Sequence, residues 1–317
     1  MRASALCAVA VLFAAASVGA APDFRVTLLG TGTPAPQLDR FGPSTLVEAG
    51  KEKLLIDCGR GVPIRLWQLR IPLSDVTAVF LTHLHSDHTS GIPDLWLTGW
   101  LPTPWGHRTS PFRIWGPAGT TEMMTNLERA YAWDTRVRAP DENIPAQGVA
   151  VVAKDIVEGV VYEKNGVKVT AFEVDHGALL KPAFGYRIDY GGRSVVISGD
   201  TRPTENLIRF AKGTDVLIHE VAMAAPELMK SSDSVRRIIG HHTIPEDVGK
   251  IFSRIKPKLA VYSHIVLFTR DGLPTVDELV AATRTTYDGP LQVGADLMAF
   301  EIGSTITVRH AGAASGN

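Results

Sequence analysis

Short apolar runs, each ended by glycine or a polar residue, recur along the chain and predict many β-strands. Stretches with the periodicity of helices lie between them in both halves of the chain. We expect strands at residues 24–29, 44–48, 53–57, 75–81, 112–116, 149–157, 160–164, 167–174, 186–190, 194–198, 215–219 and 259–262, and short strands between 291 and 308. We expect helices at residues 62–69, 89–100, 120–137, 203–212, 245–255 and 276–285. This order predicts an α/β (α+β) fold in which two sheets pack together and helices cover the outside.

The polar segment after the predicted strand 75–81 concentrates side chains that bind metals. His83, His85, Asp87 and His88 lie within six residues and include three of the 10 histidines in the chain. His83 and His85 point to the same side in an extended segment, because side chains alternate along a strand. Asp87 and His88 come at the following turn and can reach a different side. We therefore expect one loop to supply ligands to two neighbouring metal ions.

Three further metal-capable residues follow predicted strands. His176 follows the strand 167–174, Asp200 follows the strand 194–198, and His264 follows the strand 259–262. Each of them alone is an ordinary loop residue. Together with the first loop they form the layout of a metal centre assembled at one edge of a sheet. Every donor is nitrogen or oxygen, which suits zinc and does not exclude manganese or iron.

The first 20 residues have the pattern of a secretory signal peptide. Arg2 supplies a positive start, residues 3–16 are an apolar run, and Val18-Gly19-Ala20 forms a small-residue cleavage site. The run is short for a membrane span. We therefore expect a mature chain of residues 21–317, periplasmic or secreted, with no membrane contact after cleavage. Cys58 is then the one cysteine left, so no internal disulfide is expected.

The ordered set of metal-capable residues resembles the metallo-β-lactamase superfamily of binuclear hydrolases. The resemblance spans nearly the whole mature chain and rests on His83-x-His85-x-Asp87-His88, His176, Ser198-Gly199-Asp200 and His264. The ribonuclease Z and arylsulfatase branch is indicated by Leu28-Leu-Gly-Thr-Gly-Thr33, Ile56-Asp-Cys-Gly59, His219-Glu220 and His241-His242-Thr243. The resemblance implies a four-layer αββα sandwich, formed by residues 21–317 as one hydrolase domain.

Two zinc ions are also implied by the resemblance. By the family pattern His83, His85 and His176 hold the first metal, Asp87, His88 and His264 hold the second, and Asp200 bridges them. An aspartate in the bridging position is unlike the true β-lactamases of the superfamily, so we do not expect antibiotic hydrolysis. The nucleophile implied is a hydroxide that bridges the metals. Asp87 could orient it as well as bind metal.

The leaving group needs a proton, and the resemblance indicates its source. A Glu–His pair is thought to act as the acid in ribonuclease Z, and by position Glu220 would orient His241 here. The adjacent histidine leaves His242 as an alternative. A further alternative is that both histidines only begin a helix and have no chemical role.

The expected substrate is a small anionic ester, with an aryl sulfate or a phosphodiester preferred. Bacterial ribonuclease Z usually carries a tRNA-gripping arm between the third histidine and the bridging aspartate, and the interval from His176 to Asp200 has room for one hairpin only. The net charge of −1 and the pI near 6.8 supply no global basic field, so we do not expect nucleic acid as a partner. Trp96, Trp100 and Trp105 could line a pocket for an aromatic leaving group, or they could pack the helix after the metal loop. The alternatives are a ribonuclease Z-type tRNA 3′ endonuclease and a non-catalytic metal-binding protein. The sequence leaves a homodimer open.

Overall fold

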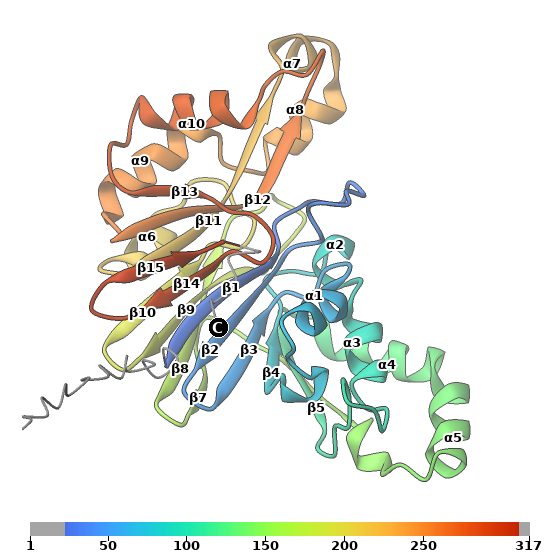
Figure 1. Ribbon diagram of the computed structural model, residues 1–317. Helices are drawn as coiled ribbons and strands as arrows, with labels where there is room; N and C mark the ends of the chain where they lie inside the picture. The colour runs from blue at the N-terminus through green and yellow to red at the C-terminus, as the bar shows by residue number, and fades with distance from the viewer. Residues whose placement is uncertain (1–22, 311–317) are drawn as a thin grey trace, which may run out of the picture.

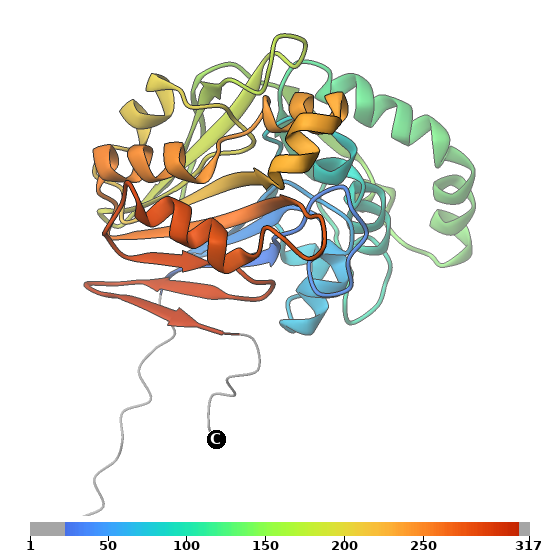
Figure 2. The same ribbon diagram turned by 90° about the horizontal axis from the view of Figure 1, so that it is seen from above.

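The computed structural model describes residues 23–310, and the predicted signal peptide lies outside them. Two sheets pack face to face, and helices cover the outer face of each (Figures 1 and 2). This arrangement confirms the αββα sandwich that the resemblance implies. None of the helices in the described range has the length and hydrophobicity that crossing a membrane requires.

The first sheet has the strand order β15-β14-β1-β2-β3-β4-β5-β6, and the second has β13-β12-β11-β10-β9-β8-β7. The strands of the first sheet are β1 (Phe24–Gly30), β2 (Ser44–Ala49), β3 (Glu52–Ile56), β4 (Ala78–Phe80), β5 (Phe112–Gly116), β6 (Val151–Asp155), β14 (Ala299–Ile302) and β15 (Ile306–Arg309). Those of the second are β7 (Gly159–Lys164), β8 (Val167–Val174), β9 (Ala183–Tyr190), β10 (Arg193–Ile197), β11 (Val216–Ala224), β12 (Leu259–Phe268) and β13 (Leu291–Val293).

The helices lie on the outside and at the ends of the sandwich. They are α1 (Val62–Gln68), α2 (Ser86–Thr89), α3 (Ile92–Thr98), α4 (Thr120–Ala130), α5 (Ala132–Asp141), α6 (Glu205–Ala211), α7 (Pro226–Ser231), α8 (Asp233–Ile239), α9 (Pro245–Ile255) and α10 (Val276–Arg284). Short 3₁₀ turns occupy Leu73–Asp75 and Ala146–Gly148. The predicted helix 120–137 is two helices, because the chain leaves helical geometry at Tyr131 (φ −99°, ψ 7°).

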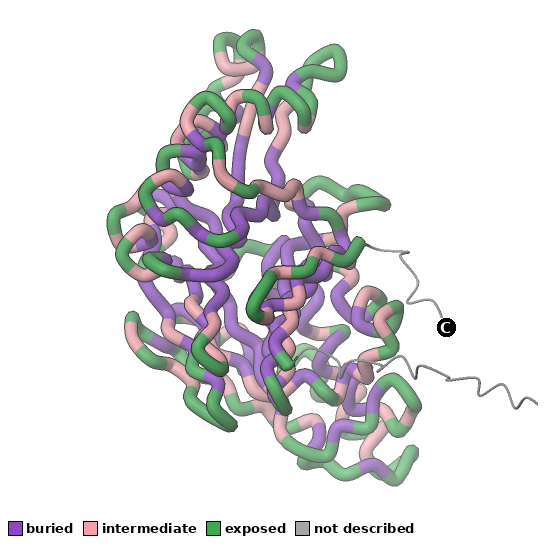
Figure 3. The backbone as a smooth tube through the Cα atoms, turned by 60° about the vertical axis from the view of Figure 1, so that its left-hand side comes forward, coloured by how far each residue is buried: buried purple, intermediate pink, exposed green. Residues whose placement is uncertain are grey.

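Three apolar layers hold the sandwich together. The layer between the sheets is built from the inward side chains of both, for example Phe80, Phe184 and Phe300, which are fully buried. The other two layers seat the helices on the outer faces, with Leu66 of α1 on the first sheet and Phe252 of α9 on the second. Buried segments therefore concentrate in the strands, and exposed ones lie in outer helices and loop tips (Figure 3). Strands covered on both faces read as continuous apolar runs, which explains why the sequence predicted them.

Two of the turns have the geometry that their residues favour. Asn165 and Gly166 (φ 51° and 79°) join β7 to β8, and Gly191 and Gly192 (φ 56° and 73°) join β9 to β10. Positive φ at both central residues is the type I′ hairpin turn, which Asn-Gly and Gly-Gly adopt at low cost. The interval between His176 and Asp200 thus holds the predicted hairpin.

The strands β11 and β12 differ from their predictions in a way that matters for the site. They were expected to end at His219 and Tyr262, yet they continue together as a parallel pair to Ala224 and Phe268. Their pairing shifts between His219 and Val221, so that Ser263 and His264 on β12 face the single residue Glu220 on β11. This is a β-bulge, which bends a strand and redirects its side chains. His264 therefore lies within a strand, in the left-handed region (φ 46°), and not past the strand end.

Candidate metal centre

The metal-capable residues come together at one edge of the sandwich, where β4, β8 and β10 end and where the bulge in β12 places His264. β4 runs parallel to β3, and the loop with His83 to His88 follows it directly. β8 and β10 are both antiparallel to β9 and therefore run in the same direction. His176 and Asp200 follow these two strands. The seven predicted ligands all lie at this edge, in groups whose ligating atoms are within 4.8 Å of one another.

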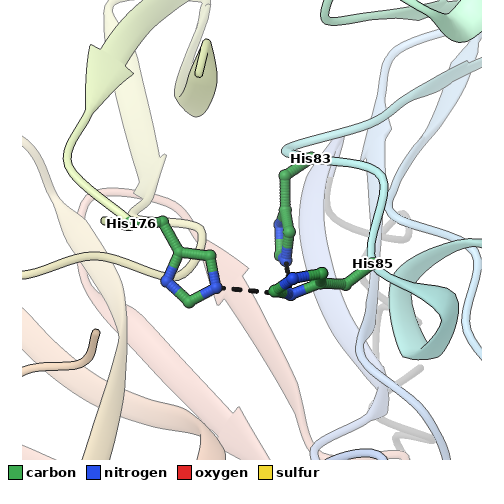
Figure 4. Close-up of side chains that lie close together, drawn as sticks. All are labelled: His83, His85 and His176. Carbon is green, nitrogen blue, oxygen red and sulfur yellow. Dashed lines mark hydrogen bonds between the residues drawn. The ribbon is translucent and has the colours of Figure 1, made fainter. Parts of the chain in front are cut away.

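His83, His85 and His176 form the first group, and their rings converge on one point (Figure 4). His83 Nε2 lies 3.0 Å from His85 Nδ1, and His176 Nε2 lies 3.4 Å from the same nitrogen. Burial lowers the pKa of all three imidazoles, which keeps them in the neutral form that binds metals. His85 is the exposed member of the group and leaves its side of the centre open.

Asp87, His88 and His264 form the second group. Asp87 Oδ2 lies 3.6 Å from His88 Nε2 and 3.3 Å from His264 Nε2. His88 Nε2 is buried and has no hydrogen-bond partner. A buried polar atom without a partner costs free energy, and a metal ion at this position would satisfy it.

Asp200 lies between the two groups. Its Oδ2 is 3.9 Å from His83 Nε2 and 3.8 Å from His176 Nε2, and it is 3.5 Å from His88 Nε2 and 3.3 Å from His264 Nε2. Burial by itself would raise the pKa of Asp200, but the neighbouring histidines hold it well below its usual range. An ionised carboxylate within 4 Å of four imidazole nitrogens has the position of a bridging ligand.

The residues present fit divalent metal ions. The donors are buried imidazoles and carboxylates, they converge from separate strands, and one of them is orphaned without a metal. The described residues also pair into two groups around one shared carboxylate, as a binuclear centre needs. The assignment of each side chain to one or the other metal remains the prediction drawn from the resemblance.

Asp57 supports the centre from behind, a role that was not predicted from the sequence. Its carboxylate accepts hydrogen bonds from the Thr82 backbone N–H and hydroxyl, both at 2.8 Å, and from His88 Nδ1–H at 2.8 Å. Burial would lower the pKa of His88, but Asp200 and Asp57 raise it well above its usual value. Asp57 thereby fixes the ring so that Nε2 faces the centre. The available signal was its place at the end of β3, which is parallel to β4.

Glu220 pairs with His242 and not with His241, which differs from the expected pairing. Glu220 Oε2 accepts from His242 Nδ1–H at 3.1 Å, and Oε1 accepts from the Thr243 backbone N–H at 2.8 Å. Burial would lower the pKa of His242, but Glu220 outweighs it and raises the value to about 9. His241 contributes its backbone carbonyl, which accepts from His176 Nδ1–H at 3.0 Å. The alternative left open for His242 is therefore the one the geometry supports, and the catalytic roles of Asp87, Glu220 and His241 stay predictions.

The tryptophans do not line the metal centre. Trp96 and Trp100 are buried and donate to the backbone carbonyls of Val149 and Pro145, both at 2.8 Å. Trp105 lies edge-on against Trp67 on the outer surface. Trp96 and Trp100 therefore pack the helix after the metal loop, which was the second of the two interpretations. The cavity above the centre is lined instead by Pro34, Ala35, Ile238, Val266 and Phe268, together with metal-capable residues.

Comparison with known proteins agrees with this geometry. The family described as Beta-lactamase superfamily domain matches residues 52–265. A protein named Ribonuclease Z from Mycolicibacterium gilvum is 32% identical over 288 residues, which cover 91% of this chain and 99% of that protein. The metallo-β-lactamase fold protein YhfI from Bacillus subtilis has a TM-score of 0.68 at 19% identity, covering 87% of this chain and 98% of its own. The short form of human tRNase Z has a TM-score of 0.62 at 21% identity, covering 88% and 99%.

These relatives overturn one expectation. We expected a small anionic ester substrate and no nucleic acid, because the chain lacks room for the tRNA-gripping arm and is nearly neutral overall. The curated relative that matches almost end to end is named for action on RNA, so that expectation is wrong. The physical reason is that net charge is a sum over the whole surface, and an arm is separable from the catalytic centre.

The seven converging metal-capable residues, the two-sheet sandwich and the extent of the family match lead to one conclusion. The chain belongs to the metallo-β-lactamase superfamily, in its ribonuclease Z branch, and is a metal-dependent hydrolase of ester bonds.

Proposed function

We propose that this protein is a ribonuclease Z-type phosphodiesterase, which cuts RNA at a phosphodiester bond next to the 3′ end of a tRNA-like substrate. The observation that carries the proposal is the 32% identity to a protein named Ribonuclease Z across 91% of this chain. The site supports it, because the clustered ligands, the buried Glu220 and the half-buried His242 supply a complete set of groups for hydrolysis.

We further propose two zinc ions, held by His83, His85 and His176 on one side and by Asp87, His88 and His264 on the other, with Asp200 shared. When bound, such a pair of cations supplies hydroxide at neutral pH and offsets charge on the phosphoryl oxygens. The nitrogen and oxygen donors support zinc, and reconstitution with manganese or iron separates it from the other candidates.

His242 is the proton donor in this proposal. Glu220 holds its Nδ1–H, so the other ring nitrogen is free to face the cavity that His242 lines. The leaving oxygen of a ribose is strongly basic and needs a proton as the bond to phosphorus breaks. Asp87 also lines the cavity, and its carboxylate can accept a hydrogen bond from the attacking water and orient it.

A substrate panel tests the proposal. Zinc-loaded protein is assayed on a 3′-extended tRNA precursor, on bis(4-nitrophenyl) phosphate and on 4-nitrophenyl sulfate at equal enzyme and metal. We expect kcat/KM to be highest for the RNA by at least about 100-fold. Turnover of the sulfate with no cleavage of any RNA would reject the proposal. His85→Ala is the matched control, since contamination by another nuclease would survive it.

Export is proposed separately. The pattern of residues 1–20 supports a cleaved signal peptide and a periplasmic or secreted domain of residues 21–317. Sequencing the N-terminus of the protein recovered from each cell fraction tests this. A chain that begins at Ala21 outside the cytoplasm is the expected result, and an intact Met1 or Arg2 start in the cytoplasm would contradict it.

A further inference from the structure

The cavity above the metal centre has a mixed lining that the catalytic groups do not explain. It holds about 350 Å³, and metal-capable side chains form its floor. Ile238 of α8 and Val266 and Phe268 of β12 form an apolar wall. Pro34 and Ala35 lie in the segment that lines another side of the cavity. Its lining residues include no lysine or arginine, and His242, whose pKa is raised to about 9, is the cationic side chain on this side of the centre.

The apolar wall is a rigid part of the fold. It is built on the continuation of β11 and β12 beyond the bulge, where Ala222 pairs with Val266 and Ala224 pairs with Phe268. Val235 and Ile239 of α8 pack on this pair of strands, and Phe268 is packed against the same cluster. The Phe268 carbonyl also accepts from the Ala225 backbone N–H at 2.9 Å. The long projecting strands and α8 are visible at the top of Figure 1.

The segment that carries Pro34 and Ala35 is fixed at both ends by Asp296. Its carboxylate accepts from the Thr31 backbone N–H at 2.9 Å and from the Phe41 backbone N–H at 2.7 Å. Arg65 Nη2 pairs with the same carboxylate at 2.8 Å. The Thr31 carbonyl accepts from the Ile265 backbone N–H at 3.2 Å, which ties this segment to the residue after His264. The cavity is therefore held open by the fold before any ligand enters.

A ligand for this cavity must place a phosphodiester over the metal ligands and an apolar, flat group beside it. In RNA that group is the base of the nucleotide attached to the scissile phosphate. Every base has an apolar face that packs against an aromatic or aliphatic side chain, and such contacts are tolerant of sequence. Building on the proposed function, we propose that Ile238, Val266 and Phe268 form a binding site for a nucleobase next to the scissile phosphate, which holds any of the four bases by apolar contact.

A double-mutant cycle between enzyme and substrate tests the site. The RNA that the zinc-loaded wild type cleaves is synthesised with one abasic ribonucleotide on the 5′ or the 3′ side of the cut. KM and kcat are measured for wild type and for Phe268→Ala with each RNA. Trp133→Ala is the matched control, because it removes an aromatic side chain that is 68% exposed on α5 and does not line the cavity.

We expect one of the two abasic positions to raise KM about tenfold for wild type and to have almost no effect on Phe268→Ala. Exchange of the base at that position should change KM less than about threefold, and Phe268→Leu should keep most of the affinity. If Phe268→Ala and each abasic position raise KM by factors that simply multiply, neither base contacts Phe268. That result would overturn the site while leaving RNA cleavage intact. Absence of any RNA cleavage by the zinc-loaded wild type would instead overturn the proposed function, and this site with it. Thermal unfolding of Phe268→Ala and Phe268→Leu shows whether each variant is folded.

Discussion

Replacement of His242 by glutamine should slow RNA cleavage in a way that depends on the leaving group. Glutamine keeps an N–H group near Glu220 but cannot deliver a proton. A positioned general acid contributes about 100- to 10,000-fold to a rate when the leaving group is strongly basic. We therefore expect kcat on RNA to fall by at least about 100-fold. Nitrophenolate leaves without a proton, so bis(4-nitrophenyl) phosphate should lose less than about fivefold.

Glu220, the partner of His242, is the site of a second variant, and its hydrogen bond gives the size of the expected rate loss. The hydrogen bond of 3.1 Å between His242 Nδ1 and Glu220 Oε2 joins two groups that are mostly buried. A hydrogen bond to a charged group is worth about 1.5–3 kcal/mol, and each 1.36 kcal/mol is a factor of ten in rate. Glu220→Gln should therefore cost about 10- to 100-fold on RNA, with the same sparing of the nitrophenyl substrate.

The control for this experiment is the neighbouring histidine. His241 lines the cavity, but its contact with His176 is made by the backbone carbonyl, so His241→Gln should cost less than about fivefold on either substrate. Single-turnover rates are compared at equal zinc content, so that loss of metal is not mistaken for loss of the acid. If His242→Gln slows both substrates equally, or if His241→Gln shows the larger difference between the two substrates, His242 is not the proton donor.

Three further predictions test other parts of the account. Asp57→Asn should weaken zinc binding about 10- to 100-fold, measured by chelator competition, because it disturbs the hydrogen bond that orients His88; unchanged affinity would argue against it. An RNA with one 2′-deoxyribose at the cleaved bond should still be cut within about tenfold of the normal rate, since water and not the 2′-hydroxyl attacks; a 2′,3′-cyclic phosphate product would contradict this. Glu52 is buried, which by itself raises its pKa, but hydrogen bonds from Tyr162, Lys164 and Asn165 outweigh burial and lower it. The ionised Glu52 carboxylate therefore stabilises the fold above about pH 4.5. This stabilisation is lost as the pH falls through the lowered pKa that Glu52 has in the folded protein. Glu52→Gln should be less stable by about 1–3 kcal/mol in urea unfolding at pH 7, and the difference from wild type should shrink below pH 4.5; a constant difference would contradict it.

The sequence was informative about the metal ligands for a physical reason. Polar residues at the ends of buried strands stand out against continuous apolar runs, and strands with the same direction end at the same edge. His83, His176 and Asp200 follow that rule and could be located from sequence. The four-layer fold followed from the resemblance that these residues carry.

Other features depended on contacts between distant strands. The bulge that places His264 within β12 arises from its pairing with β11, and no local pattern specifies a pairing shift. His241 and His242 are adjacent, and the path of the chain after α8 decides that His242 is the one that faces Glu220. Asp57 can hold His88 because β3 and β4 are neighbours in the first sheet, and the order of strands in a sheet is not visible in a local sequence pattern. The short helices α7 and α8 were missed because six or seven residues carry little periodicity.

The substrate was misjudged because absent features were given too much weight. The single hairpin between His176 and Asp200 is present as predicted, yet a missing arm says nothing about the groups that perform hydrolysis. A net charge near zero likewise does not describe the surface around the cavity. Similarity to relatives along almost the whole chain carried more information about the reaction than the missing arm or the missing positive charge.

Cleavage of RNA at this metal centre can be tested by comparing the wild type with one variant of the shared carboxylate. The rate of cleavage of a 3′-extended tRNA precursor is measured for the zinc-loaded wild type and for Asp200→Ala, with zinc per chain and thermal unfolding recorded for both. We expect a discrete cut by the wild type, and a folded Asp200→Ala protein that has lost zinc and cleaves at least about 1,000-fold more slowly. An uncut precursor with the wild type carrying two zinc ions, or an Asp200→Ala variant as active as wild type, would contradict it.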